Sequence, residues 1–242
     1  MGKLAINIEN LVITYKELHR ISLKTLKKSS TQKKKKGYTA LNGITFSVEQ
    51  GKIVGVIGKN GSGKSTLLRA IAGIFAPDEG TIETYGNSVS LLAIGIGFIN
   101  NLSGRENRIL SGLLMGFSKK EIEKKAEEII EFSELGDFID KPVQTYSSGM
   151  YSKLAFSITA IMESDIILID EVLSVGDAGF KKKSYNKVKE LISHDKRTVL
   201  IVSHNMNTIR KLCDKVLWLH NGEIMMYDST EKVITQYEQF FS

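Results

Sequence analysis

Residues 53–74 read IVGVIGKNGSGKSTLLRAIAGI and place a glycine-rich loop between an apolar strand and a helix. The loop, residues 58–65, fits the pattern G-x-x-x-x-G-K-[S/T]; we expect the strand over residues 53–57 and the helix over residues 66–74. Its glycines let successive backbone N–H groups face one cluster of phosphates, and the helix start adds the positive end of its dipole. A glycine-rich turn without a ligand is the alternative, but the flanking strand and helix favour nucleotide binding. The candidate contacts are Gly58, Asn60, Gly61, Ser62, Gly63, Lys64, Ser65 and Thr66.

Two side chains of this loop have separate expected roles. Lys64 carries the cation that would reach the β- and γ-phosphates of a nucleotide. The hydroxyl group of Ser65 is suited to Mg²⁺, because a hard cation bound to phosphates takes oxygen ligands. We therefore expect a nucleotide with a γ-phosphate, together with Mg²⁺; the family resemblance described below implies that the nucleotide is ATP.

Further apolar runs indicate the fold class. Residues 166–170 and 198–202 are rich in isoleucine, leucine and valine and read as buried strands, separated by long helical patterns. This order predicts an α/β fold with a mainly parallel sheet. Residues 4–13 and 44–48 alternate apolar and polar side chains, so they predict an antiparallel β edge.

Three polar side chains follow these strands. Asp170 and Glu171 end one strand at the carboxyl edge, where open α/β sheets bind ligands. Asp170 would hold Mg²⁺ through its water shell, and Glu171 would polarise the water that attacks the γ-phosphate; solvation of a strand end is the alternative. His204 follows the next strand, where an imidazole can sense the γ-phosphate, although a structural histidine is the alternative. Glu171 and His204 are the candidate catalytic residues.

The middle of the chain predicts a helical region. Ser118 and Glu121 form a capping box before an apolar helical pattern that runs to about Leu135. Residues 87–149 look wholly helical or looped. Near the end of the chain, Asn221-Gly222 predicts a hairpin turn, and a final helix is expected from about residue 231. We expect one domain over residues 1–242, divided into a P-loop ATPase core (1–86 and 150–242), a helical subdomain (87–149) and a basic insertion (16–37).

Composition and charge exclude several classes of protein. The single cysteine cannot form an intrachain disulfide or a cysteine zinc cluster, which is typical of a reducing compartment. The longest nearly apolar run, residues 89–99, is about half of the roughly 20 residues that cross a bilayer. The net charge is +6, but residues 16–37 hold nine basic residues and one acid, so the rest of the chain carries −2. A surface that binds nucleic acid is therefore not expected.

The basic insertion at residues 16–37 has three open interpretations. A solvated loop is the first, because blocks of like charge repel and seldom pack. The second is an amphipathic helix on anionic headgroups, since Leu18, Ile21 and Leu26 can share one face beside lysines. The third is binding to a polyphosphate-rich substrate or nucleic acid, which the charge of the remaining chain disfavours.

Together these motifs resemble the ATP-binding subunits of ABC transporters, over nearly the whole chain. Residues 146–150, YSSGM, are similar to the signature loop of that family, with Ser147 and Gly149 at its serine and final glycine. Residues 174–177, SVGD, resemble the D-loop, and His204 falls at the switch histidine. The resemblance implies a head-to-tail homodimer with two ATP molecules at its interface. It also implies that Tyr15 stacks on adenine, although a strand-end tyrosine without that role is the alternative.

Residues 95–107, 131–150 and 169–180 are similar to segments of polysaccharide exporters, and most closely to the ATPases of wall teichoic acid export. That resemblance implies an integral membrane permease as partner, a lipid-linked glycopolymer as transported substrate, and a peripheral position on the cytoplasmic face of the cell membrane. The alternative is a non-transport ABC ATPase that acts as a nucleotide switch on nucleic acid or ribosomes. One P-loop, one signature loop and the charge distribution disfavour that alternative.

Two departures from the family pattern stand out. Ser148 occupies a glycine position, which is tolerable where its φ is negative and costly where φ is positive. No glutamine occurs between Gln50 and Gln144, so the family's Q-loop contact to Mg²⁺ and water has no counterpart. Backbone groups or a water molecule at residues 95–97 are one substitute; the same apolar stretch also suits the core or a groove for a helix of the membrane partner.

Overall fold

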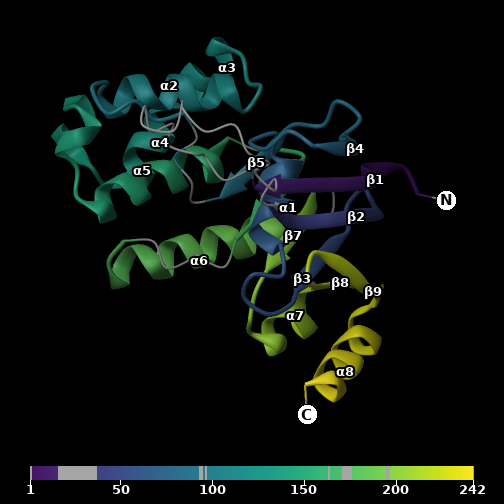
Figure 1. Ribbon diagram of the computed structural model, residues 1–242. Coiled ribbons are helices and arrows are strands. Elements are labelled where there is room, and N and C mark those ends of the chain that lie inside the picture. The colour runs from purple at the N-terminus through teal and green to yellow at the C-terminus, as the bar shows by residue number, and fades with distance from the viewer. Residues whose placement is uncertain are drawn as a thin grey trace, which may run out of the picture.

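The computed structural model describes residues 2–15, 37–92, 95, 97–162, 164–170, 176–193 and 197–241. Within this part of the chain, two sheets lie beside a lobe of helices, as Figure 1 shows. The basic insertion, apart from Gly37, lies outside the described residues, and so does Glu171.

The six-stranded sheet has the order β5-β6-β7-β3-β8-β9. The first five strands are parallel to one another, and β9 joins β8 in an antiparallel hairpin. Asn221 and Gly222 form the turn with φ values of 50° and 81°, which confirms the predicted hairpin. The strands are β3 (Ile53–Ile57), β5 (Val89–Leu92), β6 (Ile166–Ile169), β7 (Thr198–Val202), β8 (Lys215–His220) and β9 (Glu223–Ser229).

The second sheet is antiparallel and has the order β2-β1-β4. Its strands are β1 (Leu4–Tyr15), β2 (Tyr38–Glu49) and β4 (Glu79–Glu83). This sheet confirms the predicted antiparallel edge. It packs with α1 (Lys64–Ile71) against one face of the six-stranded sheet, and helices α5 to α8 cover the other face. Burial on both faces explains why β3, β6 and β7 are nearly continuous runs of aliphatic residues.

The helices fall into two groups. Those of the lobe are α2 (Gly104–Leu114), α3 (Lys119–Lys124), α4 (Ala126–Ser133) and α5 (Ser148–Ile161), with short 3₁₀ helices at Gly136–Asp140 and Val143–Thr145. They share a hydrophobic core of their own. The others are α1, α6 (Ala178–Ser193), α7 (Met206–Leu212) and α8 (Thr230–Phe240), of which α8 confirms the expected final helix.

Two sequence-based expectations for the lobe need correction. The helix expected from Ser118 to Leu135 is two helices, α3 and α4, because the backbone at Lys125 (φ −97°, ψ 5°) leaves the helical region. The capping box of Ser118 and Glu121 is confirmed. The expectation that residues 87–149 are wholly helical or looped is wrong at β5, which pairs with β6. Four residues, Val-Ser-Leu-Leu, are too few to show a period, so they merged with the apolar stretch that follows.

Helix α5 also bears on the expected division of the chain. Phe156 and Ala160 pack under the six-stranded sheet, whereas Leu154 and Ile158 pack in the core of the lobe. One helix therefore joins the two cores. The division into an ATPase core and a helical subdomain remains a prediction, with its boundary passing through α5.

The buried Arg108 on α2 yields a first testable prediction. Its side chain is 1% exposed and donates to the Ile122 carbonyl oxygen (2.9 Å) and to Glu123 Oε2 (2.9 Å). Arg108→Ala should lower the free energy of unfolding by about 2 kcal/mol, because it leaves a cavity and removes the hydrogen bonds of Arg108 to the Ile122 carbonyl oxygen and to Glu123. Urea unfolding measures this change.

Arg105 on the same helix provides the matched control. It pairs with Asp140 at 2.8 Å, but the side chains of the two are 43% and 63% exposed. Exposed ion pairs contribute little, so Arg105→Ala should cost several times less than Arg108→Ala. Equal losses for the two variants would refute a special role of the buried arginine.

Candidate nucleotide-binding site

The glycine-rich loop joins the end of β3 to the start of α1. Gly58 and Gly63 have φ values of 148° and 101°, which residues with a side chain rarely adopt. A Cβ atom at Gly63 would lie 2.6 Å from the Ala40 carbonyl oxygen, and one at Gly58 would overlap the Leu219 carbonyl oxygen. Backbone conformation and close packing thus both require glycine at these two positions. The backbone of the loop can therefore curve into a cradle in front of α1.

Lys64, the first residue of α1, lies along this loop. It is 7% exposed, and its Nζ atom donates to the carbonyl oxygens of Gly58 (2.7 Å) and Lys59 (3.0 Å). These bonds hold a buried ammonium group at the cradle, where an anionic ligand would meet it.

A cavity of about 200 Å³ lies beside the loop and brings most of the predicted residues together. Ser65 and Asp170, the two expected metal ligands, both line it, and so does His204. These residues come from α1 and from the carboxyl ends of β6 and β7, as the edge rule predicts. The described candidates that line it are Asn60, Gly61, Gly63, Lys64, Ser65, Thr66, Asp170 and His204.

Ser62 behaves differently from the other loop residues. It is 3% exposed, is not among the lining residues, and its hydroxyl has no hydrogen-bond partner in the described part of the chain. Its N–H donates to the Lys59 carbonyl at 3.2 Å, so Ser62 supports the bend of the loop from within.

Tyr38 is a lining residue that sequence reasoning missed. Its hydroxyl donates to the Gly61 carbonyl oxygen at 2.8 Å, although the side chain is 59% exposed. Tyr38 begins β2, six residues before the strand that alternation predicted at residue 44, so no pattern drew attention to it. An exposed aromatic residue at the start of that strand is the signal that was available.

Tyr15, the expected adenine platform, faces Tyr38 across the β1–β2 pair. Its hydroxyl lies 3.1 Å from Thr66 Oγ1, and its ring meets Phe75 edge-on at a centroid distance of 5.8 Å. Tyr15 is 42% exposed and is not among the residues that line the cavity. It therefore stands next to the cavity through Thr66.

The predicted signature residues lie elsewhere, at the start of α5. Ser147 caps this helix by accepting a hydrogen bond from the Met150 N–H at 3.2 Å. Ser148 is the first residue of the helix and is not among the described residues with positive φ, so serine is tolerated there. Ser147 and Gly149 line a second cavity, of about 440 Å³, which shares no described residue with the first.

Comparison with known proteins decides the family. The sequence model of the family described as ABC transporter matches residues 41–174. The O-antigen export system ATP-binding protein RfbB of Klebsiella pneumoniae is 42% identical over 240 residues, 97% of this chain and 97% of that protein. The chain belongs to the ABC transporter family. The Klebsiella relative is named as the ATP-binding protein of an export system.

A further relative differs in length. The teichoic acids export ATP-binding protein TagH of Lactococcus lactis is 48% identical over 242 residues, which are 99% of this chain and 52% of that protein. The chain thus spans about half the length of this relative and nearly the full length of the Klebsiella one.

Solved structures of ABC ATP-binding subunits share the fold. One such subunit superimposes with a TM-score of 0.71 at 21% identity, over 97% of this chain and 93% of that one. A dimeric cassette, MJ0796, bound to ADP and Pi gives 0.68 at 22% identity, over 93% and 98%. They confirm the predicted α/β architecture.

The Q-loop region of this ABC subunit departs from the family pattern. The described part includes Gly95, whose carbonyl oxygen accepts a hydrogen bond from the Tyr151 hydroxyl at 3.5 Å. Phe98 packs on the Tyr151 ring at 4.9 Å. Both contacts join this stretch to α5, which favours the interpretation that these residues belong to the core. The substitute for the missing glutamine stays an open prediction.

Every helix among the described residues is too short or too polar to cross a membrane. The solved MJ0796 cassette bound to ADP and Pi is dimeric.

Proposed function

We propose that this chain hydrolyses ATP to drive export of a lipid-linked cell-surface polysaccharide. The cavity shared by Lys64, Ser65, Asp170 and His204 supports the ATP chemistry. The export role rests on the similar proteins, which are named for export of teichoic acids and of O-antigen. Wall teichoic acid is our first candidate, because the Lactococcus relative is 48% identical and the Klebsiella relative 42%.

The donor set at the cavity fits ATP with Mg²⁺. Ser65 and Asp170 would hold the metal through oxygen atoms, and Lys64 would bind phosphate oxygens. Bound Mg²⁺ neutralises charge on the phosphates. Glu171 would accept a proton from the attacking water, His204 would face the γ-phosphate, and Tyr15 would stack on the base.

The two separate cavities support a head-to-tail homodimer. Within one chain, Ser147 and Gly149 line one cavity and the P-loop lines the other. We propose that the Ser147 loop of each subunit completes the nucleotide site of its partner. The dimer would bind an integral membrane permease and so lie peripherally on the cytoplasmic face of the cell membrane.

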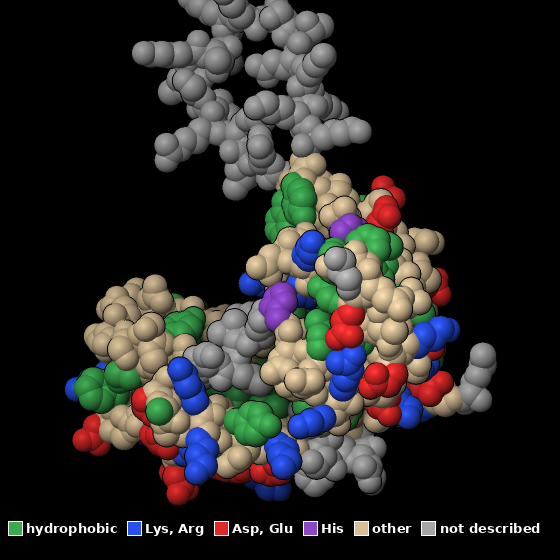
Figure 2. All heavy atoms as spheres, turned by 90° about the horizontal axis from the view of Figure 1, so that it is seen from below, with side chains coloured by type: hydrophobic (Ala, Val, Ile, Leu, Met, Phe, Trp, Pro, Cys, Tyr) green, Lys and Arg blue, Asp and Glu red, His purple; other side chains and the backbone are tan. Residues whose placement is uncertain are grey.

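Co-purification tests this proposal. We expect a membrane permease to copurify with the chain in mild detergent. Lipid-linked teichoic acid precursors should stimulate the ATPase activity of that complex, whereas unrelated lipid-linked glycans should not. Bound RNA in place of a membrane protein would favour the nucleotide-switch alternative. That alternative has little support, since Lys and Arg side chains are interspersed with Asp and Glu on the face shown in Figure 2.

Tyr38 offers a test within the nucleotide site. Tyr38→Phe keeps the ring but removes the hydrogen bond to the Gly61 carbonyl. We expect an affinity for ATP weaker by up to about fivefold, because the bond contributes about 1 kcal/mol to holding the loop in the conformation that would receive the phosphates. Titration with a fluorescent ATP analogue measures it. Tyr185→Phe on α6 is the matched control, because Tyr185 is also 59% exposed. An unchanged affinity of Tyr38→Phe would remove Tyr38 from the site.

A further inference from the structure

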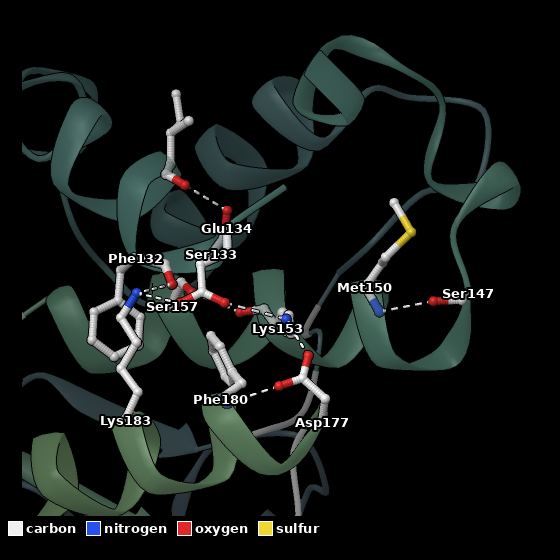
Figure 3. Close-up of polar contacts among 11 residues, drawn as sticks. Phe132, Ser133, Glu134, Ser147, Met150, Lys153, Ser157, Asp177, Phe180 and Lys183 are labelled. Atoms are coloured by element: carbon white, nitrogen blue, oxygen red, sulfur yellow. Dashed lines mark hydrogen bonds and ion pairs between the residues drawn. The ribbon is translucent and has the colours of Figure 1, made fainter. Parts of the chain in front are cut away.

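Three elements meet at the second cavity: the end of α4, the first turns of α5 and the start of α6, as Figure 3 shows. Glu134, Lys153 and Asp177 come one from each element, and all three line the cavity beside Ser147. Lys153 lies between the two acids.

Lys153 is the most buried member of this group. Its side chain is 14% exposed, while Asp177 is 65% and Glu134 is 45% exposed. Its Nζ atom lies 2.7 Å from Asp177 Oδ2 and 3.3 Å from Glu134 Oε2. A largely desolvated ammonium group needs such partners, so the two acids fix where it lies.

Asp177 is held from two directions. One carboxylate oxygen bonds Lys153 on α5, and the other accepts a hydrogen bond from the Phe180 N–H on α6 at 3.0 Å. These donors lower the pKa of Asp177 to about 2, so the contact persists at neutral pH. Gly176 precedes it with a φ of 70°, and a Cβ atom there would lie 2.9 Å from Lys153 Cε. The backbone at the end of the D-loop thus packs closely against the Lys153 side chain.

Glu134 extends the connection to the helical lobe. It is the C-cap of α4 with a φ of 56°, a left-handed conformation that is common where helices end. In that conformation its carboxylate reaches both Lys153 and Lys183, the latter at 2.9 Å. Glu134 therefore connects the end of α4 to both α5 and α6.

We propose that Lys153 is a positioning residue that locks the Asp177 end of the D-loop to the Ser147 loop. Ser147 and Lys153 are six residues apart, about 9 Å along the same helix, so a contact at Lys153 moves with the signature loop. The two loops then reach the partner subunit as one unit. This inference rests on the proposed dimer, in which Ser147 acts across the interface.

The test compares two lysines that share Glu134. Lys153→Met keeps the length of the side chain but removes its charge. Lys183→Met likewise removes an ion pair with Glu134, but the other partner of Lys183 is the Phe132 carbonyl oxygen (3.0 Å) and not Asp177. In the purified full chain, Lys153→Met should lower kcat at least about tenfold with ATP affinity within about twofold, because positioning acts after binding. Lys183→Met should keep kcat within about twofold, and Lys153→Arg should restore most of the loss.

A double-mutant cycle measures whether Lys153 and Asp177 act on kcat through each other. Asp177→Asn changes an exposed group and should lower kcat in a folded protein; combined with Lys153→Met it should lower kcat no further. Additive losses, parental kcat in Lys153→Met, or equal losses in Lys153→Met and Lys183→Met would each overturn the inference. A parent chain that fails to bind or hydrolyse ATP would instead contradict the proposed function.

Discussion

Lys64→Ala is expected to weaken ATP binding at least about 100-fold. Lys64 is the one lysine or arginine among the described residues that line the cavity beside the glycine-rich loop, which we call the phosphate cavity. Its buried ammonium group already gives hydrogen bonds to two carbonyls of the loop, so it is positioned to give charge-assisted bonds to phosphate oxygens. Alanine removes that charge from a site built for anions. Calorimetric titration with ATP and Mg²⁺ measures the dissociation constant.

Lys52 is the control for this substitution. It lies before the amino end of β3, opposite to the P-loop, and forms an exposed pair with Asp214 at 3.4 Å. Lys52→Ala changes the net charge equally but should leave the dissociation constant within about twofold. Similar weakening in both variants would mean that overall charge, rather than a contact at the cradle, controls affinity.

The parts of the fold that the sequence predicted are those encoded by neighbouring residues. The P-loop needs one contiguous strand, loop and helix, and the hairpin needs only Asn221-Gly222 between two alternating runs. Asp170 and His204 were expected at one edge because parallel strands bring their carboxyl ends together. The cavity that both residues line agrees with that expectation.

The parts that the sequence missed depend on tertiary contacts. β4 has mostly exposed residues and exists through its pairing with β1. β5 is too short to show a period, and it is a strand because β6 lies beside it. Tyr38 and Lys153 belong to no motif, and their partners lie on other elements. Such contacts are decided by packing, which single-sequence patterns do not contain.

Glu171→Gln should reduce ATP turnover by about 100-fold or more while ATP still binds. Asp170 lines the phosphate cavity, and Glu171 is the next residue along the chain. Glutamine has the shape of glutamate but lacks the basic oxygen that would take a proton from the attacking water. A phosphate-release assay measures kcat, and titration with ATP should give a dissociation constant near that of the parent. Glu131→Gln, the same change on an exposed residue of α4, should leave both unchanged.

The same variant also tests the dimer. If hydrolysis releases the two subunits, a subunit that binds ATP without hydrolysing it should accumulate as a head-to-tail dimer. Light scattering of Glu171→Gln in ATP and Mg²⁺ should then report twice the mass of the chain, and Lys64→Ala added to it should return the monomer, because the nucleotide no longer binds. Parental turnover in Glu171→Gln would remove Glu171 as the base. Monomers in ATP, with or without the permease, would contradict the composite site in which Ser147 faces the partner's P-loop.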